Sequence, residues 1–293
     1  MNILVTGANG QLGTALREVP KAHDDRWIFT DVTQLPGVET VFLDITDRDA
    51  VRIVCESERI DVIVNCAAYT NVDKAEDDQS TADLLNHLAP SNLAAAAAER
   101  NAVLIHVSTD YVFRGDKCVP YAEEDAPDPT GVYGVTKLAG ERAILESGCK
   151  SLIFRTAWLY SPWGRNFVKT MLQLMQTRPS LKVVYDQVGS PTYAPDLAAL
   201  IAHVIGTRDF DKTGIYHFTD EGAISWYDFT MAIRDISGLR GCPVAPCLST
   251  EYPTKAERTH YSVLDKSKVR KTFDIPFPYW RDSLELCLKR LIP

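Results

Sequence analysis

The sequence lacks any grouping of cysteines or histidines that would hold a metal ion or build a disulfide framework. Its seven cysteines are an odd number, are scattered and include no Cys-x-x-Cys pair, and its six histidines show no ligand spacing. We therefore expect reduced thiols, no metal site and a cytoplasmic protein.

Long apolar runs and an excess of positive charge are also missing. No apolar run approaches the roughly 18 residues that a membrane span needs. Residues 1–7 hold no basic segment ahead of the apolar one, so we expect a strand that starts at once and not a secretory signal. The 31 Lys and Arg residues against 39 Asp and Glu residues give a net charge of −8, which argues against non-specific binding to nucleic acid or an anionic membrane.

What the sequence does contain is an alternation of apolar runs and helical segments. We expect strands at 2–6, 27–31, 41–45, 60–68, 102–107 and 151–155, and an alanine-rich helix over 82–100 with an interruption near Pro90. The run at 60–68 is continuously apolar, as in a strand buried on both faces. This order predicts an α/β protein with a doubly wound parallel sheet, the Rossmann arrangement, over residues 1–155. Residues 156–293 would form a smaller substrate-binding lobe, with some segments returning to the first domain.

Glycines with the spacing Gly7-x-x-Gly10-x-x-Gly13 stand between the first expected strand and the first helix. They allow a tight turn and a close approach of backbone N–H groups to a phosphate, so we expect the diphosphate of a dinucleotide at this helix N-terminus. Small residues at the end of the fourth strand would let the cofactor approach the backbone. The expected cofactor contacts are Gly7, Asn9, Gly10, Gln11, Leu12, Gly13, Asp31, Asp44, Ile45, Ala67, Ala68, Tyr69, Tyr133 and Lys137.

Three polar residues bear on how that cofactor is held. Asp31 ends the second expected strand, where a carboxylate can bind a ribose 2′-OH, and it slightly favours NAD(H) because it would repel a 2′-phosphate. Asp44 is placed either to touch the adenine edge or to cap the helix that starts near Asp47. Asn86 is either a bridge between backbone and active site or a surface amide. The choice between NADH and NADPH is left open.

Tyr133 and Lys137 are four residues apart, which places them one turn apart on one face of a helix. An isolated phenol with a pKa of about 10 exchanges protons poorly at neutral pH, and a neighbouring cation lowers that pKa. Ser108 to Phe113 follow the strand at 102–107, at the carboxyl end where open α/β sheets bind ligands, so the Thr109 hydroxyl can reach a substrate oxygen.

Together, the glycine motif, the run Ser108 to Phe113 and Tyr133-x-x-x-Lys137 resemble the extended short-chain dehydrogenase/reductase superfamily. The resemblance is closer still to its reductases of 4-keto-6-deoxy nucleotide sugars. It covers essentially the whole chain, through further matching stretches at 132–141, 154–158, 166–167, 186–192 and 252–262. It implies NADPH or NADH as the cofactor and a dTDP-4-keto-6-deoxy-hexose as the substrate.

The resemblance also implies roles for single residues. Tyr133 would protonate the C4 oxygen of the sugar while the C4 carbon receives a hydride, and Thr109 would orient and polarise that oxygen. Lys137 would lower the pKa of Tyr133 and hold the nicotinamide ribose. The implied substrate contacts are Thr109, Asp110, Tyr111, Trp158, Asn166, Gln187 and Arg258.

Two positions depart from the pattern of this superfamily. Some members carry an acidic residue just after the glycine motif, which helps to bind magnesium at a dimer interface; here Ala15 stands there, and residues 291–293 offer no carboxylate side chain. We therefore expect no metal, and either a monomer or a homodimer. Thr259 stands where a proline usually follows the position of Arg258.

Two other functions fit parts of the pattern. A nucleotide-sugar epimerase or dehydratase on the same scaffold would retain its cofactor through each turnover, and Asp110, next to Thr109, would supply the additional acid that a dehydratase needs. A non-catalytic regulatory subunit would not need Thr109, Tyr133 and Lys137 all intact. The reductase is therefore the function that the sequence favours.

Overall fold

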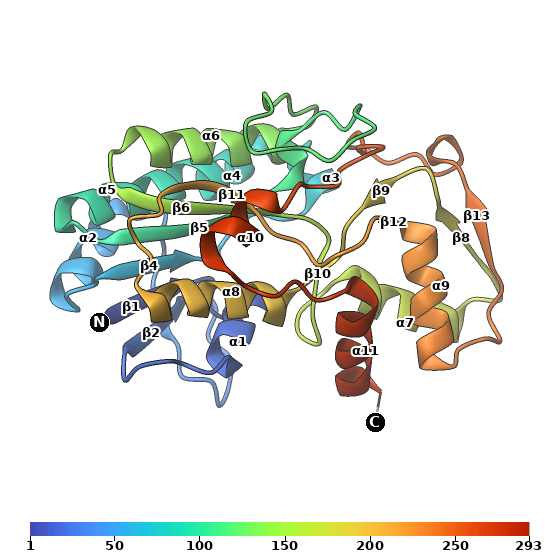
Figure 1. Ribbon diagram of the computed structural model, residues 1–293, viewed down its shortest axis with the longest axis horizontal. Coiled ribbons are helices and arrows are strands. Elements are labelled where there is room, and N and C mark those ends of the chain that lie inside the picture. Colours follow the sequence, from blue (N-terminus) through green and yellow to red (C-terminus); the bar gives the residue numbers. More distant parts are fainter. Residues whose placement is uncertain (293) are drawn as a thin grey trace.

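The computed structural model describes residues 1–292 and is built on a seven-stranded sheet (Figure 1). Every strand pairing in this sheet is parallel, and the strand order is β11-β6-β5-β4-β1-β2-β3. The expected doubly wound α/β fold is therefore confirmed. The strands are β1 (Asn2–Thr6), β2 (Arg26–Asp31), β3 (Val41–Phe42), β4 (Val62–Asn65), β5 (Val103–Thr109), β6 (Lys150–Thr156) and β11 (Gly214–His217).

Helices cover both faces of the sheet, so alternate residues of each central strand enter different cores. Ile3 and Val5 of β1 pack with one set of helices and Leu4 packs with the other. The first set is α1 (Gln11–Glu18), α8 (Ala194–Thr207) and α10 (Ser267–Phe273); the second includes α2 (Arg48–Ser57), α5 (Ala89–Arg100) and α6 (Val132–Glu146). Burial on both faces explains why the strand sequences are continuously apolar.

The outermost strand and the helix before β5 differ from the simple expectation. β3 ends at Phe42 instead of residue 45, and both of its residues are exposed at the open edge of the sheet. Pro90 does not break its helix: α4 (Gln79–Asp83) continues through a π-helical turn, Leu84–Leu88, into α5. Proline has no N–H and its ring would clash with the carbonyl four residues back, that of Asn86, in a regular α-helix. The wider turn removes that conflict.

A second lobe, made of three helices and three short strand pairs, lies at one end of the sheet (Figure 1). Its core contains Phe229 and Trp280. The helices are α7 (Phe167–Thr177), α9 (Trp226–Ser237) and α11 (Trp280–Leu291). The pairs are β7 (Leu159–Tyr160) with β10 (Thr192–Tyr193), β9 (Val188–Gly189) with β12 (Ile224–Ser225), and β8 (Leu181–Val184) with β13 (Val244–Cys247).

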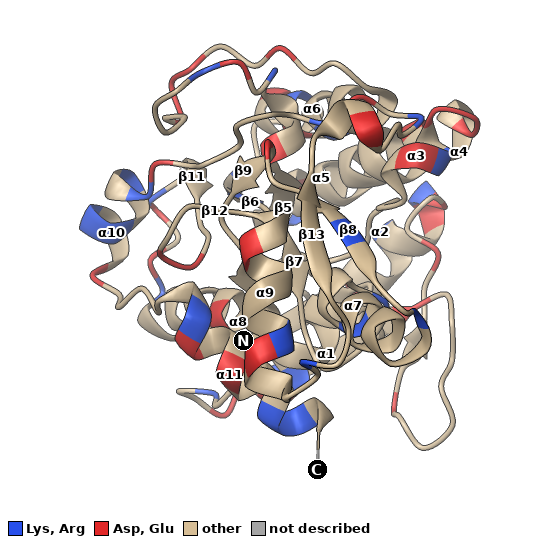
Figure 2. Cartoon of the chain, turned by 90° about the vertical axis from the view of Figure 1, so that its right-hand side faces the viewer, with Lys and Arg blue, Asp and Glu red and all other residues tan. Residues whose placement is uncertain are grey.

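Segments beyond residue 155 return to the sheet, since β11 pairs with β6 and α8 packs on α1. The division of the chain at residue 155 remains a prediction. Short elements complete the described chain: α3 (Val72–Ala75), a 3₁₀ turn at Asp110–Val112 and another at Ser249–Glu251. None of the described helices is long and apolar enough to cross a membrane. Figure 2 views the molecule from the end where the second lobe lies and shows charges of both signs, with an acidic and a basic residue on α3 and basic residues at the end of α11.

Candidate active site

The glycine turn after β1 forms an open cradle for an anion. Gly7 has φ +63°, and a Cβ atom there would lie 2.6 Å from the backbone nitrogen of Ala67 at the end of β4. Gly10 is the N-cap of α1, no side chain caps this helix, and its first turn holds no acidic residue. Uncapped N–H groups and the positive end of the helix dipole favour a phosphate. The residues therefore fit the diphosphate of a dinucleotide.

Asp31 lies beside this turn, as predicted, but its carboxylate is already engaged. Its two oxygens accept hydrogen bonds from the backbone nitrogens of Asn9 (3.0 Å) and Thr33 (2.9 Å). The sequence analysis missed Arg17, whose guanidinium stacks 4.2 Å from the centre of the Phe29 ring and donates to the side chain of Asn9. A cation close to the acidic residue offsets its repulsion of a 2′-phosphate, so Asp31 alone does not decide between NADH and NADPH.

Asp44 does not cap the helix that follows it, which removes one of its two interpretations. Its carboxylate accepts hydrogen bonds from the backbone and hydroxyl of Thr46, at 2.9 and 2.7 Å. Asp47 is the N-cap of α2 and accepts a hydrogen bond from the backbone nitrogen of Ala50. Contact of Asp44 and the neighbouring Ile45 with the adenine remains a prediction.

Asn86 is buried and joins the end of β4 to α6. Its Oδ1 accepts a hydrogen bond from the backbone nitrogen of Tyr69 (2.8 Å), and its Nδ2 donates to the Tyr69 carbonyl (3.1 Å) and to the Thr136 hydroxyl (3.2 Å). It is therefore a bridge and not a surface amide. The bridge fixes the segment Ala67, Ala68 and Tyr69 against the helix that carries Tyr133 and Lys137.

Close packing of α6 brings Tyr133 to the end of β5. A Cβ atom on Gly134 would lie 2.2 Å from the Tyr111 carbonyl oxygen, so glycine lets the helix start directly on the turn that follows Thr109. The rings of Tyr111 and Tyr133 meet edge to face with centres 5.4 Å apart. Burial raises the pKa of the Tyr133 phenol, while a hydrogen bond with Thr109 opposes the rise. The phenol thus keeps the proton that a donor must carry.

Lys137 is buried, and its ammonium finds its partners on β5. Its Nζ donates to the Val107 carbonyl at 2.7 Å and lies 3.3 Å from His106 Nε2. Burial lowers the pKa of Lys137 to about 8, although Glu141 opposes this effect. In this structure burial, Asp110 and Tyr111 raise the pKa of the phenol and Thr109 opposes the rise, so the expected lowering by this cation is not seen. The role of Lys137 toward Tyr133 therefore remains a prediction.

Thr109 and Asp110 form a hydrogen-bonded pair at the carboxyl end of β5. The Thr109 hydroxyl donates to Asp110 Oδ1 at 3.0 Å and accepts from the Tyr111 backbone nitrogen at 3.2 Å. Burial raises the pKa of Asp110 to about 6, and hydrogen bonds with Ser262 and Thr109 oppose the rise. Asp110 thus fixes the direction of the Thr109 hydroxyl.

Trp158 lies after β6, in a cluster with Trp226 and Gly189. It has a left-handed backbone with φ +50°, a strained conformation that tends to occur at functional sites. Its ring stacks on Trp226, with centres 3.5 Å apart. A Cβ atom on Gly189 would lie 2.7 Å from the Trp158 ring and 2.9 Å from the Ser262 hydroxyl, which in turn reaches Asp110. The sequence analysis did not identify Trp226 or Ser262 as site residues, because their contacts join distant segments.

Arg258 lies beside the Tyr111 hydroxyl and is held there by α3. Its Nη2 donates to Asp73 Oδ2 at 2.6 Å, and it forms a hydrogen bond with Tyr111, whose pKa burial raises to about 12. Thr259, the unusual residue next to it, packs against Gly115. The structure therefore brings Arg258 close to Tyr111, and Asp73 is a neighbour that was not predicted from the sequence.

Asn166, Gln187 and Gln11 make contacts within the protein. Asn166 is the N-cap of α7 and donates from Nδ2 to Gln11 Oε1 at 3.0 Å, which ties the glycine turn to the second lobe. Gln187 donates to the Ser249 hydroxyl at 2.8 Å. Their contacts with substrate or cofactor remain predictions. Within residues 1–292 no group of three or more His, Cys, Asp or Glu side chains is arranged to hold a metal ion, and Pro293 lies outside the described residues.

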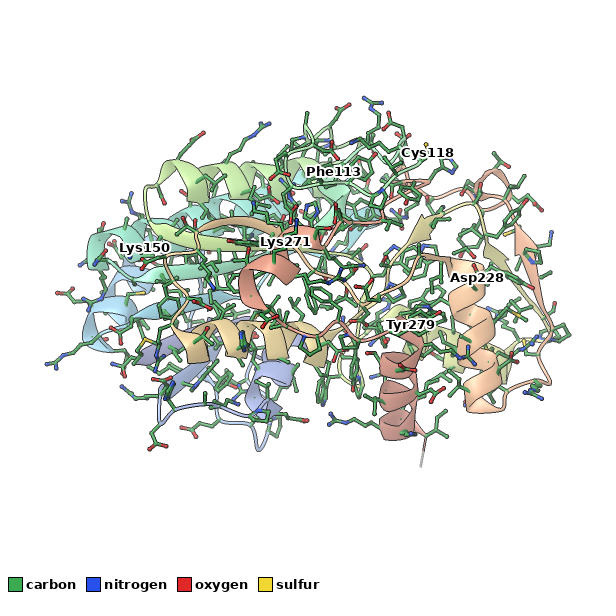
Figure 3. The ribbon with its side chains drawn as sticks, in the orientation of Figure 1. Phe113, Cys118, Lys150, Asp228, Lys271 and Tyr279 are labelled. Atoms are coloured by element: carbon green, nitrogen blue, oxygen red, sulfur yellow. The ribbon has the colours of Figure 1, made fainter. Side chains whose placement is uncertain are left out.

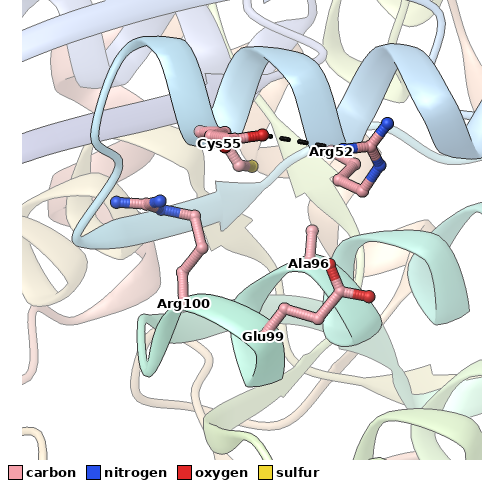
Figure 4. A pocket seen from close by; sticks show the side chains of 6 residues that line it. Arg52, Cys55, Ala96, Glu99 and Arg100 are labelled. Atoms are coloured by element: carbon pink, nitrogen blue, oxygen red, sulfur yellow. Dashed lines mark ion pairs between the residues drawn. The ribbon is translucent and has the colours of Figure 1, made fainter.

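A hollow of about 210 Å³ between α2 and α5 belongs to a different part of the molecule (Figure 4). It lies where these helices end and lead into β4 and β5, at the opposite end of the strands from the candidate active site. Its lining balances two cations, Arg52 and Arg100, against Glu56 and Glu99. This hollow therefore has no preference for an anionic ligand.

Comparison with known proteins gives one consistent result. The family model described as RmlD substrate binding domain matches residues 1–292. The dTDP-4-dehydrorhamnose reductase of Aggregatibacter actinomycetemcomitans is 42% identical over 97% of both chains, and that of Escherichia coli K12 is 40% identical over 99% of this chain and 98% of its own.

Solved structures agree with the sequence relatives. The Clostridium acetobutylicum dTDP-4-dehydrorhamnose reductase superimposes with a TM-score of 0.91 at 41% identity, over 99% of each chain. The Bacillus anthracis enzyme, solved in complex with NADP, gives 0.89 at 36% identity over 98% of each chain.

The protein is thus an NAD(P)H-dependent oxidoreductase of the extended short-chain dehydrogenase/reductase class. The fold, the glycine turn, the helix with Tyr133 and Lys137, and the relatives agree on this class. More narrowly, the chain belongs to the dTDP-4-dehydrorhamnose reductase family. The resemblance stated from the sequence motifs is confirmed.

Proposed function

We propose that this protein reduces the C4 ketone of dTDP-6-deoxy-L-lyxo-4-hexulose with NADPH or NADH and releases dTDP-L-rhamnose. The observation that carries the proposal is the close packing of the start of α6 on the turn after β5, which brings the Tyr133 phenol to Thr109 at the same end of the strands as the glycine turn. Membership of the dTDP-4-dehydrorhamnose reductase family supports the choice of substrate.

In this reaction the protein supplies protons, orientation and charge. A bound nicotinamide dinucleotide supplies the hydride. Tyr133 gives its phenolic proton to the C4 oxygen as negative charge develops there, and Thr109 holds that oxygen in place. Lys137, whose pKa lies near neutrality, stabilises the phenolate that remains. In this structure the Thr109 hydroxyl donates its only hydrogen to Asp110, so it would have to turn from Asp110 to the C4 oxygen when the substrate binds.

The second lobe would bind the nucleotide sugar. We assign Arg258 to the diphosphate or the sugar because it is a cation beside Tyr111. We assign Trp158 to the sugar because its strained backbone holds an indole that stacks on Trp226 and packs at Gly189, next to Ser262. We retain the division into a dinucleotide-binding domain (1–155) and a substrate lobe (156–293), a monomer or homodimer, and a cytoplasmic location as parts of this proposal.

The direct test is oxidation of NADPH and NADH by the purified protein when it is given the dTDP-keto sugar. Tyr133→Phe removes the proton donor, so we expect kcat to fall by about 10²- to 10⁴-fold with unchanged cofactor binding, measured by fluorescence titration. Tyr185→Phe, at an exposed tyrosine, is the matched control and should keep full activity. Full turnover by Tyr133→Phe would refute the assigned donor.

The adjacent acid Asp110 keeps a dehydratase or epimerase as the second candidate. Its pKa of about 6 leaves part of the carboxyl protonated near neutral pH, as an acid catalyst requires. Such an enzyme would hold oxidised cofactor after purification and would consume no reduced cofactor during turnover. The same assay therefore separates it from the reductase.

A further inference from the structure

A row of buried polar side chains runs behind the proposed site and ends at Lys137. It crosses neighbouring strands from Thr6 on β1 through Asn65 on β4 to His106 on β5. Each of the four side chains is at most 2% exposed. The proposed reaction uses only Lys137 of these residues.

The amide of Asn65 has one allowed orientation. Its Oδ1 accepts hydrogen bonds from the Thr6 hydroxyl at 2.7 Å and from the backbone nitrogen of Ala67 at 3.1 Å. A backbone N–H can only donate, so the oxygen of the amide must lie on that side. The Nδ2 group, which can only donate, therefore faces His106 Nδ1 at 3.0 Å.

This orientation fixes the tautomer of His106. Nδ1 accepts a hydrogen bond from Asn65 and must be the unprotonated nitrogen of the ring, so a neutral imidazole carries its hydrogen on Nε2. Burial, and then the charge of Lys137, lower the pKa of His106 well below its usual value, so the ring is neutral. Its Nε2–H group points at Lys137 Nζ, 3.3 Å away.

The contact therefore suits a neutral amine better than an ammonium. A neutral lysine nitrogen can accept the hydrogen of Nε2, whereas an ammonium has only donors and meets another donor. The Val107 carbonyl, 2.7 Å from Nζ, has the opposite effect. It accepts a hydrogen bond from the ammonium and so favours the charged form of Lys137. The two contacts, on adjacent residues of β5, oppose each other.

We propose that His106 is a positioning residue for catalysis: with its tautomer fixed by Asn65 and Thr6, its Nε2–H holds down the proton affinity of Lys137. An apolar side chain at position 106 would fill the same buried site but would leave Asn65 Nδ2 without an acceptor and present no donor to Lys137, so stability and the pKa of Lys137 are measured separately. The arrangement keeps Lys137 able to gain or lose a proton near neutral pH.

Other ionisable groups around Lys137 do not replace this effect. Glu141 on α6 raises the proton affinity of Lys137, and its carboxylate is paired with Arg155 of β6 at 2.9 and 2.7 Å. Most other ionisable groups on or beside the elements packed against α6 have partners of their own. They include Asp110 with Thr109, Tyr111 with Arg258, His87 with Asp83, Glu76 with the backbone of Val132, Asp73 with Arg258, Lys74 with Asp78 and Lys150 with Asp211. Glu99 and Arg100 of α5 line the hollow between α2 and α5, at the other end of the strands.

The first test measures the tautomer directly and needs no variant. Long-range ¹H–¹⁵N correlation spectra of the full chain should show His106 Nδ1 as an unprotonated and Nε2 as a protonated ring nitrogen. A proton on Nδ1 in the wild-type protein would overturn the proposal. This result does not depend on catalytic activity.

The second test reverses the tautomer. In Asn65→Asp the carboxylate still accepts from Thr6 and Ala67 but would also accept from Nδ1–H, so that Nε2 becomes an acceptor for the Lys137 ammonium. We expect Nδ1 to become protonated and the pKa of Lys137, followed through its ¹⁵Nζ signal, to rise by about one unit or more. A rise without a change of tautomer would show a simple charge effect and would contradict the proposed device.

The control is Thr30→Val, which removes another buried hydroxyl of the same sheet, one that donates to the Val5 carbonyl at 3.0 Å. It should leave the His106 tautomer and the pKa of Lys137 unchanged. The kinetic consequence rests on the proposed reductase function. In Asn65→Asp the alkaline limb of the plot of kcat against pH should move to higher pH, with little change in KM. If the protein reduces no keto sugar, the spectroscopic results still decide the role of His106.

Discussion

The sheet region and the second lobe are built from different kinds of contact. In the sheet, strands of four to seven residues such as β1, β4, β5 and β6 pair in parallel and are buried on both faces. In the second lobe, strands of two to four residues pair across long stretches of chain, as β8 does with β13, and aromatic side chains fill the core. We expect the sheet region to set the stability of the molecule, and the second lobe to contribute to substrate affinity if it binds the sugar as proposed.

The largest expected effect tests the stability of the sheet region. Arg155 and Glu141 form a buried ion pair whose two hydrogen bonds measure 2.9 and 2.7 Å, with Phe113, labelled in Figure 3, 5.0 Å from the guanidinium. Arg155→Met leaves the Glu141 carboxylate buried without its partner, so we expect a loss of about 3–5 kcal/mol in the free energy of unfolding, measured with urea.

The matched change in the second lobe is Lys182→Met, which breaks the exposed pair of Lys182 with Glu251. It should cost less than about 1 kcal/mol. Equal losses in the two variants would contradict the difference between the regions. Adding Glu141→Leu to Arg155→Met should restore most of the lost stability, because no uncompensated charge remains.

The next effect concerns the packing of α6. A Cβ atom on Gly140 would lie 2.1 Å from the carbonyl oxygen of Asn86, so Gly140→Ala should push the helix outward and cost about 1–3 kcal/mol, read from thermal unfolding. Gly241→Ala, after the second-lobe helix α9, meets nothing within 4 Å and serves as the control. Unchanged stability of Gly140→Ala would mean that α6 is not tightly positioned.

The next effect depends on pH and concerns Asp220, which follows β11 where the sheet region meets the second lobe. Burial, and then Asp196, raise the pKa of Asp220 well above its usual value. The folded protein therefore keeps a proton that the unfolded chain releases above about pH 4, and stability falls as pH rises from there through the folded pKa. The side chain in Asp220→Asn cannot ionise. We therefore expect the melting temperature of the variant, relative to that of the wild type, to rise from pH 4 to pH 8 by the equivalent of about 1 kcal/mol. A constant difference across that range would show that Asp220 ionises normally.

The smallest effect tests whether Arg258, which the segment beyond residue 155 supplies and Asp73 of α3 holds, acts on affinity. Asp73→Asn weakens the hold on Arg258, and we expect KM for the nucleotide sugar to rise by roughly threefold to tenfold, the equivalent of about 1 kcal/mol, with stability and cofactor binding nearly unchanged. Asp77→Asn, which breaks the exposed pair with Lys255, should have no effect on KM. A loss of stability instead of affinity in Asp73→Asn would remove the distinction between the two regions.

The same contrast explains what the sequence could predict. The apolar runs located β1, β2, β5 and β6 to within about two residues, because a strand buried on both faces has a local signature. The glycine turn and the Tyr133–Lys137 spacing are also local. Trp226, Asp73 and His106 were missed because their roles depend on partners far away in the chain, and a two-residue strand such as β9 leaves no periodic pattern.

The π-helical turn at Leu84–Leu88 lets one helix make two contacts that lie in different directions. A turn of this kind holds one more residue than a regular turn, so the faces before and after it are rotated by about 100° relative to an unbroken helix. The extra residue lets Asn86 face the helix of Tyr133 while the alanines beyond Pro90 lie flat on the sheet. Removing one residue from this turn would therefore shorten the helix only slightly, but it would rotate one of the two faces away from the element that it contacts.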